Sequence, residues 1–351
     1  PMTGNPLDQI IADNWPSLEG INDASLVQPV IGALRSAGQL AGIEKYTNDQ
    51  IWAALENHRN GGSQPDQEDL KTPEWEVLTQ ENSPKDYPFF MSKKVSAPKQ
   101  LEWAFENVLL LERLREVNAL IGFTRVEAPD EGQEDEAAPK APLSRNKPDF
   151  VPASEVHGEG IFIEFKKSAL EAWEASLAVK SREETLISGH RGWRIRRNLD
   201  PDQKFPGMRH ILLHTFAHVL IRELALQCGY NAASIRERIY AENNAEKDQS
   251  GVLIYTAAAD SDGTLGGLVE LGNPENLGPI ISKALDRAKV CASDPLCSEH
   301  DPSKDQTLHG AACHACSLIA ETSCEFGNRH LDRSLLVPTF HVTETAFFNE
   351  S

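Results

Sequence analysis

Five of the six cysteines of this 351-residue chain lie within 34 positions near its C-terminus. Their spacing is C-x5-C-x15-C-x2-C-x7-C, and they are Cys291, Cys297, Cys313, Cys316 and Cys324. Four thiolates can surround one tetrahedral zinc ion at about 2.3 Å each, and a C-x2-C pair supplies two of them from one tight turn. The cluster therefore predicts a structural zinc site held by four of the five cysteines, with Cys313 and Cys316 as the most constrained ligands.

Two other interpretations of the cysteine cluster stay open. One is a disulfide framework, which is typical of short secreted chains, and the other is a set of unrelated buried thiols. The length of the chain and an N-terminal segment without a basic region or a long apolar core argue against secretion. We therefore expect a reducing, cytoplasmic setting.

Composition and net charge narrow the class of protein. Hydrophobic residues make up 40% of the chain and charged residues 25%, as in folded globular proteins. No stretch approaches the roughly 18 consecutive apolar residues of a membrane span, so we expect no membrane partner. The 34 basic and 53 acidic residues give a net charge of −19, which opposes non-specific attraction to DNA. A lone, tight, non-specific DNA binder is not expected, although a local basic patch can still bind nucleic acid.

A chain of this length can form two or three hydrophobic cores. Changes in the spacing of apolar, charged and proline residues along the sequence predict three regions. Residues 1–95 are expected to be an irregular helical N-terminal region, with helices at 26–40 and 47–58 and a short strand at 75–78. Residues 96–200 are expected to be a mixed α/β region, and residues 201–351 a zinc-binding domain.

The middle region has two long apolar patterns separated by an acidic segment. Apolar residues at three- and four-residue steps predict an amphipathic helix at 99–122. The segment 127–148 is expected to be a solvated loop, because six of the ten residues from 127 to 136 are acidic. A strand at 158–165 and a following helix complete this region.

In the last region, predicted helices alternate with predicted strands. The pattern predicts a buried helix at 208–228, a helix at 231–244, a strand at 250–260, a helix at 281–290, and a helix followed by a strand at 331–348. The whole chain is therefore expected to be an α/β protein, with a mixed sheet flanked by helices and a zinc-stapled C-terminal domain.

A basic run with one aromatic residue lies at the end of the middle region, before the buried helix. Its members are Arg191, Trp193, Arg194, Arg196 and Arg197. Arginines with an interleaved aromatic can hold phosphates and stack on a base, but the same composition can dock on an acidic partner or form a solvated face.

The predicted buried helix carries a polar stripe, because His210, His214, His218 and Arg222 recur every four residues and share one face. A pair H-x3-H on a helix can chelate zinc, but Thr215 stands where a zincin has the glutamate that acts as general base. Satisfied polar core residues, or a stripe facing a partner or ligand groove, are therefore favoured over a catalytic metal.

A glycine-rich loop at 260–267 follows a predicted strand and precedes a helix, where an α/β sheet can bind an anion. It contains Asp260 and Asp262 but matches neither a G-x-G-x-x-G fingerprint nor a P-loop. A structural turn is favoured over a phosphate contact.

Three segments together resemble a known family: RHILLHTFAHVLIRELALQCGYNAASIRERIY, SGVLIYTAAADSDGTLGGLVEL and CASDPLC…GAACHACSLIAETSCEFGNRHLDRSLLV. They are similar to the helicase-associated MrfA zinc-binding (MZB) type of domain, and more closely to the DrmB family of DISARM anti-phage defence. Upstream, REVNALIGFTRVEAP and HGEGIFIEF also resemble DrmB, so the likeness spans roughly residues 101–337.

The resemblance implies a non-catalytic accessory subunit that partners a DrmA-like helicase or translocase and engages DNA through that complex. It implies structural Zn²⁺ on four of the five cysteines, with Asn328, Asp332 and Arg333 bracing the site. Two rivals stay open. One is a zinc-dependent nuclease or hydrolase using the His210, His214 and His218 stripe with Asp260 or Asp262. The other is a stand-alone nucleic-acid binding module using the arginine run.

Overall fold

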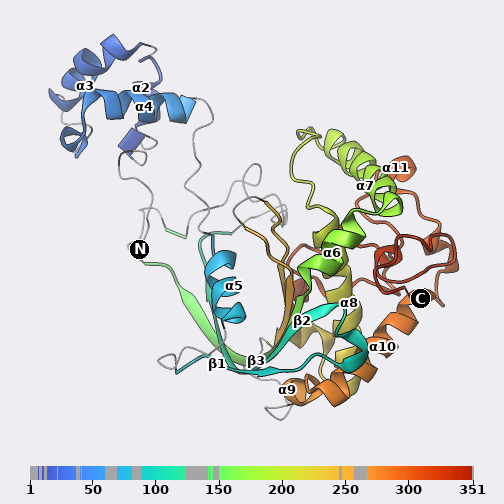
Figure 1. Cartoon of the computed structure of the whole chain (residues 1–351). Helices are drawn as coiled ribbons and strands as arrows, with labels where there is room; N and C mark the ends of the chain where they lie inside the picture. Colours follow the sequence, from blue (N-terminus) through green and yellow to red (C-terminus); the bar gives the residue numbers. More distant parts are fainter. Residues whose placement is uncertain are drawn as a thin grey trace. The chain divides into compact units, whose positions relative to one another are not determined.

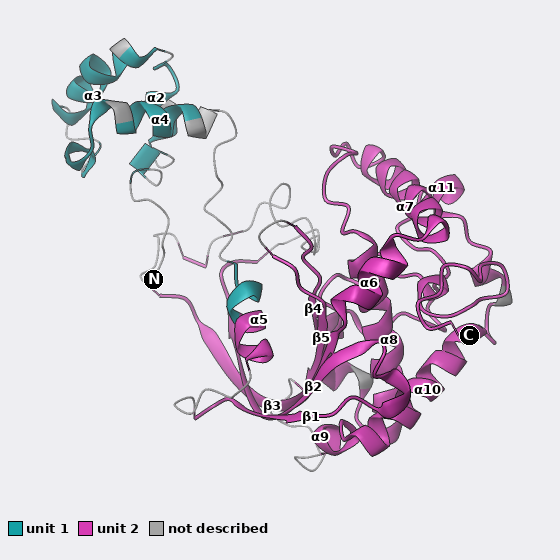
Figure 2. Cartoon of the chain, viewed as in Figure 1, with its two compact units in different colours: residues 1–73 teal, residues 74–351 magenta. Residues whose placement is uncertain are grey.

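The computed structural model describes residues 7, 10–11, 14–21, 23–36, 40, 42–59, 69–80, 88–123, 141, 143–144, 150–244, 247–256 and 267–349. The chain divides into two compact units, residues 1–73 and 74–351 (Figure 2). The predicted glycine-rich loop at 260–266 lies outside the described residues, and so does nearly all of the predicted acidic loop at 127–148.

The first unit is helical in its described residues. Its helices are α2 (Trp15–Leu18), α3 (Val27–Ser36) and α4 (Asn48–Arg59), with 3-10 turns η1 (Ala24–Leu26) and η2 (Ile43–Lys45). Its aliphatic side chains form a core of their own, which includes Ile11, Val27, Ile43 and Leu55.

The second unit is built on one five-stranded sheet with the strand order β1-β2-β3-β5-β4. The strands are β1 (Met91–Val95), β2 (Phe105–Ala119), β3 (Ala153–Phe165), β4 (Ile235–Tyr240) and β5 (Gly251–Thr256). The α/β class is confirmed. The sheet, however, is not mixed as expected, because every pairing among these strands is antiparallel.

Two segments predicted to be helices are strands. The segment 99–122 forms the 3-10 turn η3 (Lys99–Leu101) and then β2, which pairs with β1 on one side and β3 on the other. Both faces of the sheet are covered here, so residues 108–111 are all buried. A continuous apolar run of this kind does not alternate as a half-exposed strand does, and it also satisfies the three- and four-residue spacing of a helix. The segment 231–244 forms η4 (Ala232–Ser234) and the edge strand β4.

The reverse error occurs at residues 75–78, where the expected strand is part of helix α5 (Lys71–Thr79). Trp75 and Leu78 of α5 pack against side chains of one sheet face, among them Leu111, Phe162 and Tyr255. Alternate residues of the same strands, such as Ile161 and Ile254, point into the larger core on the other face.

Helices cover that second face, as Figure 1 shows for α8, α9 and α10. The helices of this part of the chain are α6 (Lys167–Glu174), α7 (Leu177–Ile195), α8 (Met208–Cys228), α9 (Gly267–Leu271) and α10 (Pro274–Lys289). Of these, α8 and α9 contact the strands, whereas α7 packs mainly against residues 302–305. α8 is buried on nearly all sides and contacts β4, β5 and α10. By length and composition it could cross a membrane, but 78% of its most apolar window is buried within the protein, as in the core helix of a globular domain.

After α10 the chain continues in turns. The elements are η5 (Pro295–Ser298), α11 (Pro302–Asp305), η6 (Glu321–Ser323) and η7 (Arg333–Leu335). The strand expected near the end is not found in the described residues 331–349. Phe347 and Phe348 instead donate backbone hydrogen bonds to the carbonyls of Leu335 and Leu336, and their rings enter the main core.

Candidate metal centres

Four of the five clustered cysteines meet at one point. Cys291 follows α10, Cys297 lies in η5, and Cys313 and Cys316 lie in one turn of the following segment. The Sγ atoms of Cys291 and Cys313 are 3.6 Å apart, as are those of Cys313 and Cys316, and those of Cys297 and Cys316 are 3.9 Å apart. All four sulfurs lie within 4.8 Å of one another.

These separations fit one zinc ion. Four sulfurs at about 2.3 Å from a tetrahedral ion lie about 3.8 Å from each other. Backbone N–H groups also point at the sulfurs, from Asp294 to Cys291 at 3.3 Å and from Cys313 to Cys316 at 3.3 Å. Burial works against the Cys291 thiolate, but the hydrogen bond from Asp294 and the contact with Cys313 hold its pKa below its usual value. The donor set is therefore suited to zinc.

Arg333, which the family resemblance placed around the zinc, lies against this cluster. Its guanidinium is buried and donates to the Cys297 sulfur at 3.0 Å, to the carbonyl of Ala311 at 3.1 Å and to the carbonyl of Ala288. A single side chain thus ties the end of α10, the segment before Cys313 and one sulfur together.

Asp332 supports the segment that leads to Cys313. One carboxylate oxygen accepts from the backbone N–H of Ala311 at 3.0 Å, and the other accepts from Arg182 of α7 at 2.8 Å. Asn328 bridges a second part of the same segment, because its side-chain amide exchanges hydrogen bonds of 2.9 and 3.0 Å with the backbone of Ile319.

The polar stripe of α8 faces the cysteine-rich segment. His218 Nδ1 donates to the carbonyl of Ser317 at 2.8 Å. One turn later, Arg222 donates to the carbonyls of Ala315 and Leu318 at 2.6 and 2.9 Å. His214 and His218 are fully buried, so they are not placed to contact nucleic acid or a partner in this structure.

The fifth cysteine lies in a different group of donors. Cys324, His214, His218 and Glu237 offer donor atoms that all lie within 4.8 Å of one another. Burial opposes ionisation of the Glu237 carboxyl, but His218 and His214 hold its pKa well below its usual range. Sequence reasoning missed Glu237 because it treated residues 231–244 as a helix. The alternation of Ile235, Glu237 and Ile239 could have revealed a strand with Glu237 pointing inward.

All four arginines of the basic run make contacts within the protein. Arg194 is only 4% exposed and donates to the carbonyl of Asp200, so it is not available to a partner. Arg196 donates to the carbonyl of Gln306, and the guanidinium of Arg197 stacks on Trp193 at 3.9 Å. Arg191 forms an exposed ion pair with Asp202 at 2.6 Å. Burial thus removes Arg194 from the predicted contact residues, whereas Arg191, Arg196 and Arg197 are exposed.

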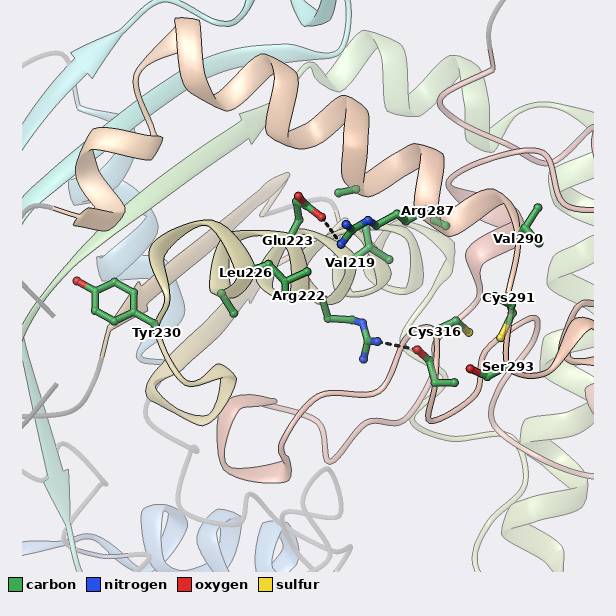
Figure 3. A pocket seen from close by; sticks show the side chains of 15 residues that line it. Val219, Arg222, Glu223, Leu226, Tyr230, Arg287, Val290, Cys291, Ser293 and Cys316 are labelled. Carbon is green, nitrogen blue, oxygen red and sulfur yellow. Dashed lines mark hydrogen bonds and ion pairs between the residues drawn. The ribbon is translucent and has the colours of Figure 1, made fainter. Parts of the chain in front are cut away.

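A pocket of about 540 Å³ opens beside the four-cysteine cluster. Figure 3 shows Cys291 and Cys316 at one end of it and Tyr230 at the other. Arg222 lies on the pocket wall, and the buried Glu223 is paired there with Arg287 of α10 at 2.8 Å. The cysteine cluster thus lies at the edge of a largely apolar pocket with a few charged side chains, not in an open cleft of histidines and carboxylates.

The family comparison decides what this region is. Residues 216–317 match the MrfA Zn-binding domain, called MZB. This stretch of the chain is therefore similar to an MZB domain. Four clustered cysteines fall within the matched residues, whereas Cys324 lies beyond them. The match and the four-cysteine geometry together confirm the predicted structural zinc.

Comparison with curated proteins confirms the predicted resemblance to DrmB. The chain is 37% identical over 307 residues to the DISARM protein DrmB of Bacillus paralicheniformis (strain ATCC 9945a / NCIMB 11709 / CD-2). The matched region covers 85% of this chain and 52% of that protein, so the chain spans about half the length of this relative.

Among solved structures, the chain is similar to the crystal structure of the DUF1998 helicase MrfA bound to DNA. The TM-score is 0.26 and the identity 12%, over 66% of this chain and 23% of that chain. A likeness at this level carries no argument about the fold or the function of this chain.

Proposed function

We propose that this chain is a non-catalytic accessory subunit that partners a DrmA-like DNA helicase or translocase in DISARM-like anti-phage defence. The observation that carries the proposal is the 37% identity to DrmB over 85% of the chain, together with the MZB domain. The similarity to DrmB and to the MrfA Zn-binding domain supports a defence-associated, helicase-related role. The helicase partner, the engagement of DNA and the cytoplasmic location are the proposed part.

The chemistry of the cysteine site supports an accessory role. Four protein thiolates fill the tetrahedral positions of zinc, whereas a catalytic zinc ion keeps one position for water or substrate. We propose Cys291, Cys297, Cys313 and Cys316 as the ligands, with Arg333, Asp332 and Asn328 as the residues that hold the ligand-bearing segments. This zinc would stabilise the fold of the domain that meets the partner.

The charge of the chain supports DNA engagement through a complex instead of by the chain alone. A net charge of −19 opposes binding to a polyanion, and all four arginines of the 191–197 run make contacts within the protein. A motor subunit with its own DNA-binding surface would supply the attraction that this chain lacks.

Co-purification tests the proposal. The chain is co-expressed with a DrmA-like helicase from the same genome, and with an unrelated helicase of similar size as control. We expect a stable complex with the DrmA-like protein only, and weak DNA binding by the isolated chain.

Failure to form the complex would contradict the accessory role. Steep loss of DNA affinity with salt in the isolated chain, reduced by Arg191→Ala, would favour a stand-alone nucleic-acid binding module. Nuclease activity that persists through purification and is lost in His214→Ala would favour the hydrolase.

A further inference from the structure

We propose that His214, His218, Glu237 and Cys324 bind a second zinc ion, separate from the ion of the four-cysteine site. The four residues come from three parts of the chain: two from α8, one from β4 and one from the turn after η6. The proposal accounts for the fifth cysteine of the cluster.

The donor atoms are spaced as zinc ligands are. His214 Nε2 lies 3.0 Å from Glu237 Oε1 and 3.2 Å from Cys324 Sγ, and His218 Nε2 lies 3.3 Å from Glu237 Oε1. Nitrogen and oxygen ligands at about 2.0–2.1 Å from a tetrahedral ion lie about 3.3 Å apart, and a nitrogen and a sulfur ligand lie about 3.6 Å apart. Imidazole, carboxylate and thiolate are the three ligand types that zinc accepts.

The hydrogen bond of His218 orients this ring as in a metal ligand. Nδ1 faces the carbonyl of Ser317, which can only accept, so the Nδ1 proton is donated there. The neutral ring then carries a lone pair on Nε2, which faces the Glu237 carboxylate, also an acceptor. A cation between these two acceptors removes the conflict, and metal-bound histidines commonly donate their second nitrogen to a carbonyl in this way.

Cys324 lies in a turn that directs two backbone N–H groups at its sulfur. Its Sγ accepts backbone N–H groups from Phe326 at 3.3 Å and Asn328 at 3.1 Å. Gly327 and Asn328 have φ values of 57° and 59°, a left-handed conformation that glycine and asparagine adopt most readily. Hydrogen bonds to a charged form stabilise it, but burial and the neighbouring Glu237 carboxylate hold the pKa of this thiol well above its usual value, so a bound cation would be needed to keep the sulfur as a thiolate.

Glu237 is a buried carboxylate whose Oε1 faces both histidines of the cluster. Its side chain is only 3% exposed, and its Oε2 has no hydrogen-bond partner within the described part of the chain. A buried carboxylate oxygen without a partner is costly, and a bound cation compensates it. The His214 ring is positioned by packing, with its centroid 4.4 Å from that of His218 and 5.5 Å from that of Phe326.

The alternative occupant is a proton. An imidazolium at His218 could donate to Ser317 and to Glu237, leaving Cys324 as a neutral thiol. That arrangement places an ion pair in the core, and the two backbone N–H groups would then meet a neutral sulfur, which accepts hydrogen bonds only weakly. A zinc ion would instead accept the Nε2 lone pairs of His214 and His218 and balance the charges of the Glu237 carboxylate and the Cys324 thiolate.

The second zinc would be structural, because the four donors are buried and come from protein. It would join α8 to the edge strand β4 and to the last turns of the chain. It would also connect to the first site, because His218 binds the carbonyl of Ser317, the residue that follows the proposed ligand Cys316.

Zinc content and X-ray absorption on the full-length wild-type protein test the proposal. We expect two zinc ions per chain, one with four sulfur donors and one with a single sulfur and three nitrogen or oxygen donors. The average would be near two and a half sulfurs per ion. Folded protein that contains one ion surrounded by sulfur alone would overturn the proposal.

Variants locate the second ion. Cys324→Ser and Glu237→Gln should each lower the zinc content from two ions to one and raise the average sulfur coordination toward four. His210→Gln is the matched control, because His210 belongs to the same helical stripe but not to the donor cluster, and it should keep two ions. Two ions in folded Cys324→Ser would refute the assignment, and where a variant is insoluble the wild-type measurement decides.

Discussion

Arg333 is the residue through which the four-cysteine site is connected to the rest of the core. It is among the largest fully buried side chains of the described residues, and it serves one sulfur and two carbonyls. The pKa of its guanidinium lies above its usual value, because the neighbouring thiolates of Cys316 and Cys297 outweigh the effect of burial. Its charge offsets part of the negative charge that four thiolates leave on the zinc.

Replacement of Arg333 by lysine should weaken zinc binding. Lysine keeps the positive charge but cannot span a sulfur and two carbonyls with a planar group. We expect zinc affinity to fall by about 10–100-fold, as for other residues that orient metal ligands, in competition with a chelator. Arg191→Lys, on the exposed part of α7, is the control and should leave affinity unchanged. Equal affinity of the two variants would show that Arg333 does not hold the site.

His190 should make the protein less stable in mild acid. Burial holds its pKa below the usual value, and Arg194 contributes in the same direction. In the unfolded chain His190 is protonated below about pH 6.5, whereas in the folded chain it stays neutral to a lower pH. The free energy of unfolding therefore falls as the pH drops below about 6.5.

His190→Gln should flatten this part of the pH dependence, measured as the difference in unfolding midpoint between the two proteins from pH 7.5 to pH 5. Zinc release affects both proteins and cancels in that difference. A parallel decline in the two proteins would rule out the contribution of His190.

At the scale of elements, α7 lies unusually close to α11. A Cβ atom added at Gly189 would lie 2.6 Å from the Thr307 carbonyl and 2.7 Å from that of Pro302. Gly192, one turn later, faces mainly the side chain of Gln306, which can move more easily than backbone.

Gly189→Ala should therefore destabilise the protein by about 1–3 kcal/mol, as overpacking does, despite the better helix propensity of alanine. Gly192→Ala should cost less. Thermal unfolding checks both, and a Gly189→Ala protein as stable as the wild type would contradict the close packing of these helices.

The elements also show what a single sequence could predict. The buried helix α8 was predictable because it is long and apolar on nearly every side. β2 was not, because Val108 to Leu111 are buried between two covered faces, and such a run does not alternate. The helix at α5 was missed because its nine residues carry too few apolar positions to show a period.

The same limits apply to the metal centres. The C-x2-C spacing predicted the zinc and its most constrained ligands from local geometry alone. Spacing could not separate Cys324 from the other four, because its neighbours His214 and Glu237 are brought to it by α8 and β4. Only the tertiary fold assigns the fifth cysteine to another group.

At the scale of the whole molecule, the two units have separate cores. A chain that begins at residue 69 keeps α5, whose Glu74 accepts from Arg238 at 2.8 Å and from Tyr240 at 2.9 Å. We expect this chain to fold, to bind as much zinc as the full-length protein and to unfold at a similar temperature. Aggregation or loss of zinc on removal of the first unit would show that its fold depends on that unit.

The central claim is that zinc on Cys291, Cys297, Cys313 and Cys316 is a folding ligand. The most direct test is zinc content and thermal unfolding of Cys313→Ser beside Cys228→Ser, since Cys228 lies at the end of α8 outside both donor clusters. Metal-binding energy is folding energy in such a site. We therefore predict that Cys313→Ser loses the zinc and the cooperative unfolding of residues 74–351, whereas Cys228→Ser retains both. A Cys313→Ser protein that keeps its full zinc content, or that unfolds like the wild type without it, would contradict the claim.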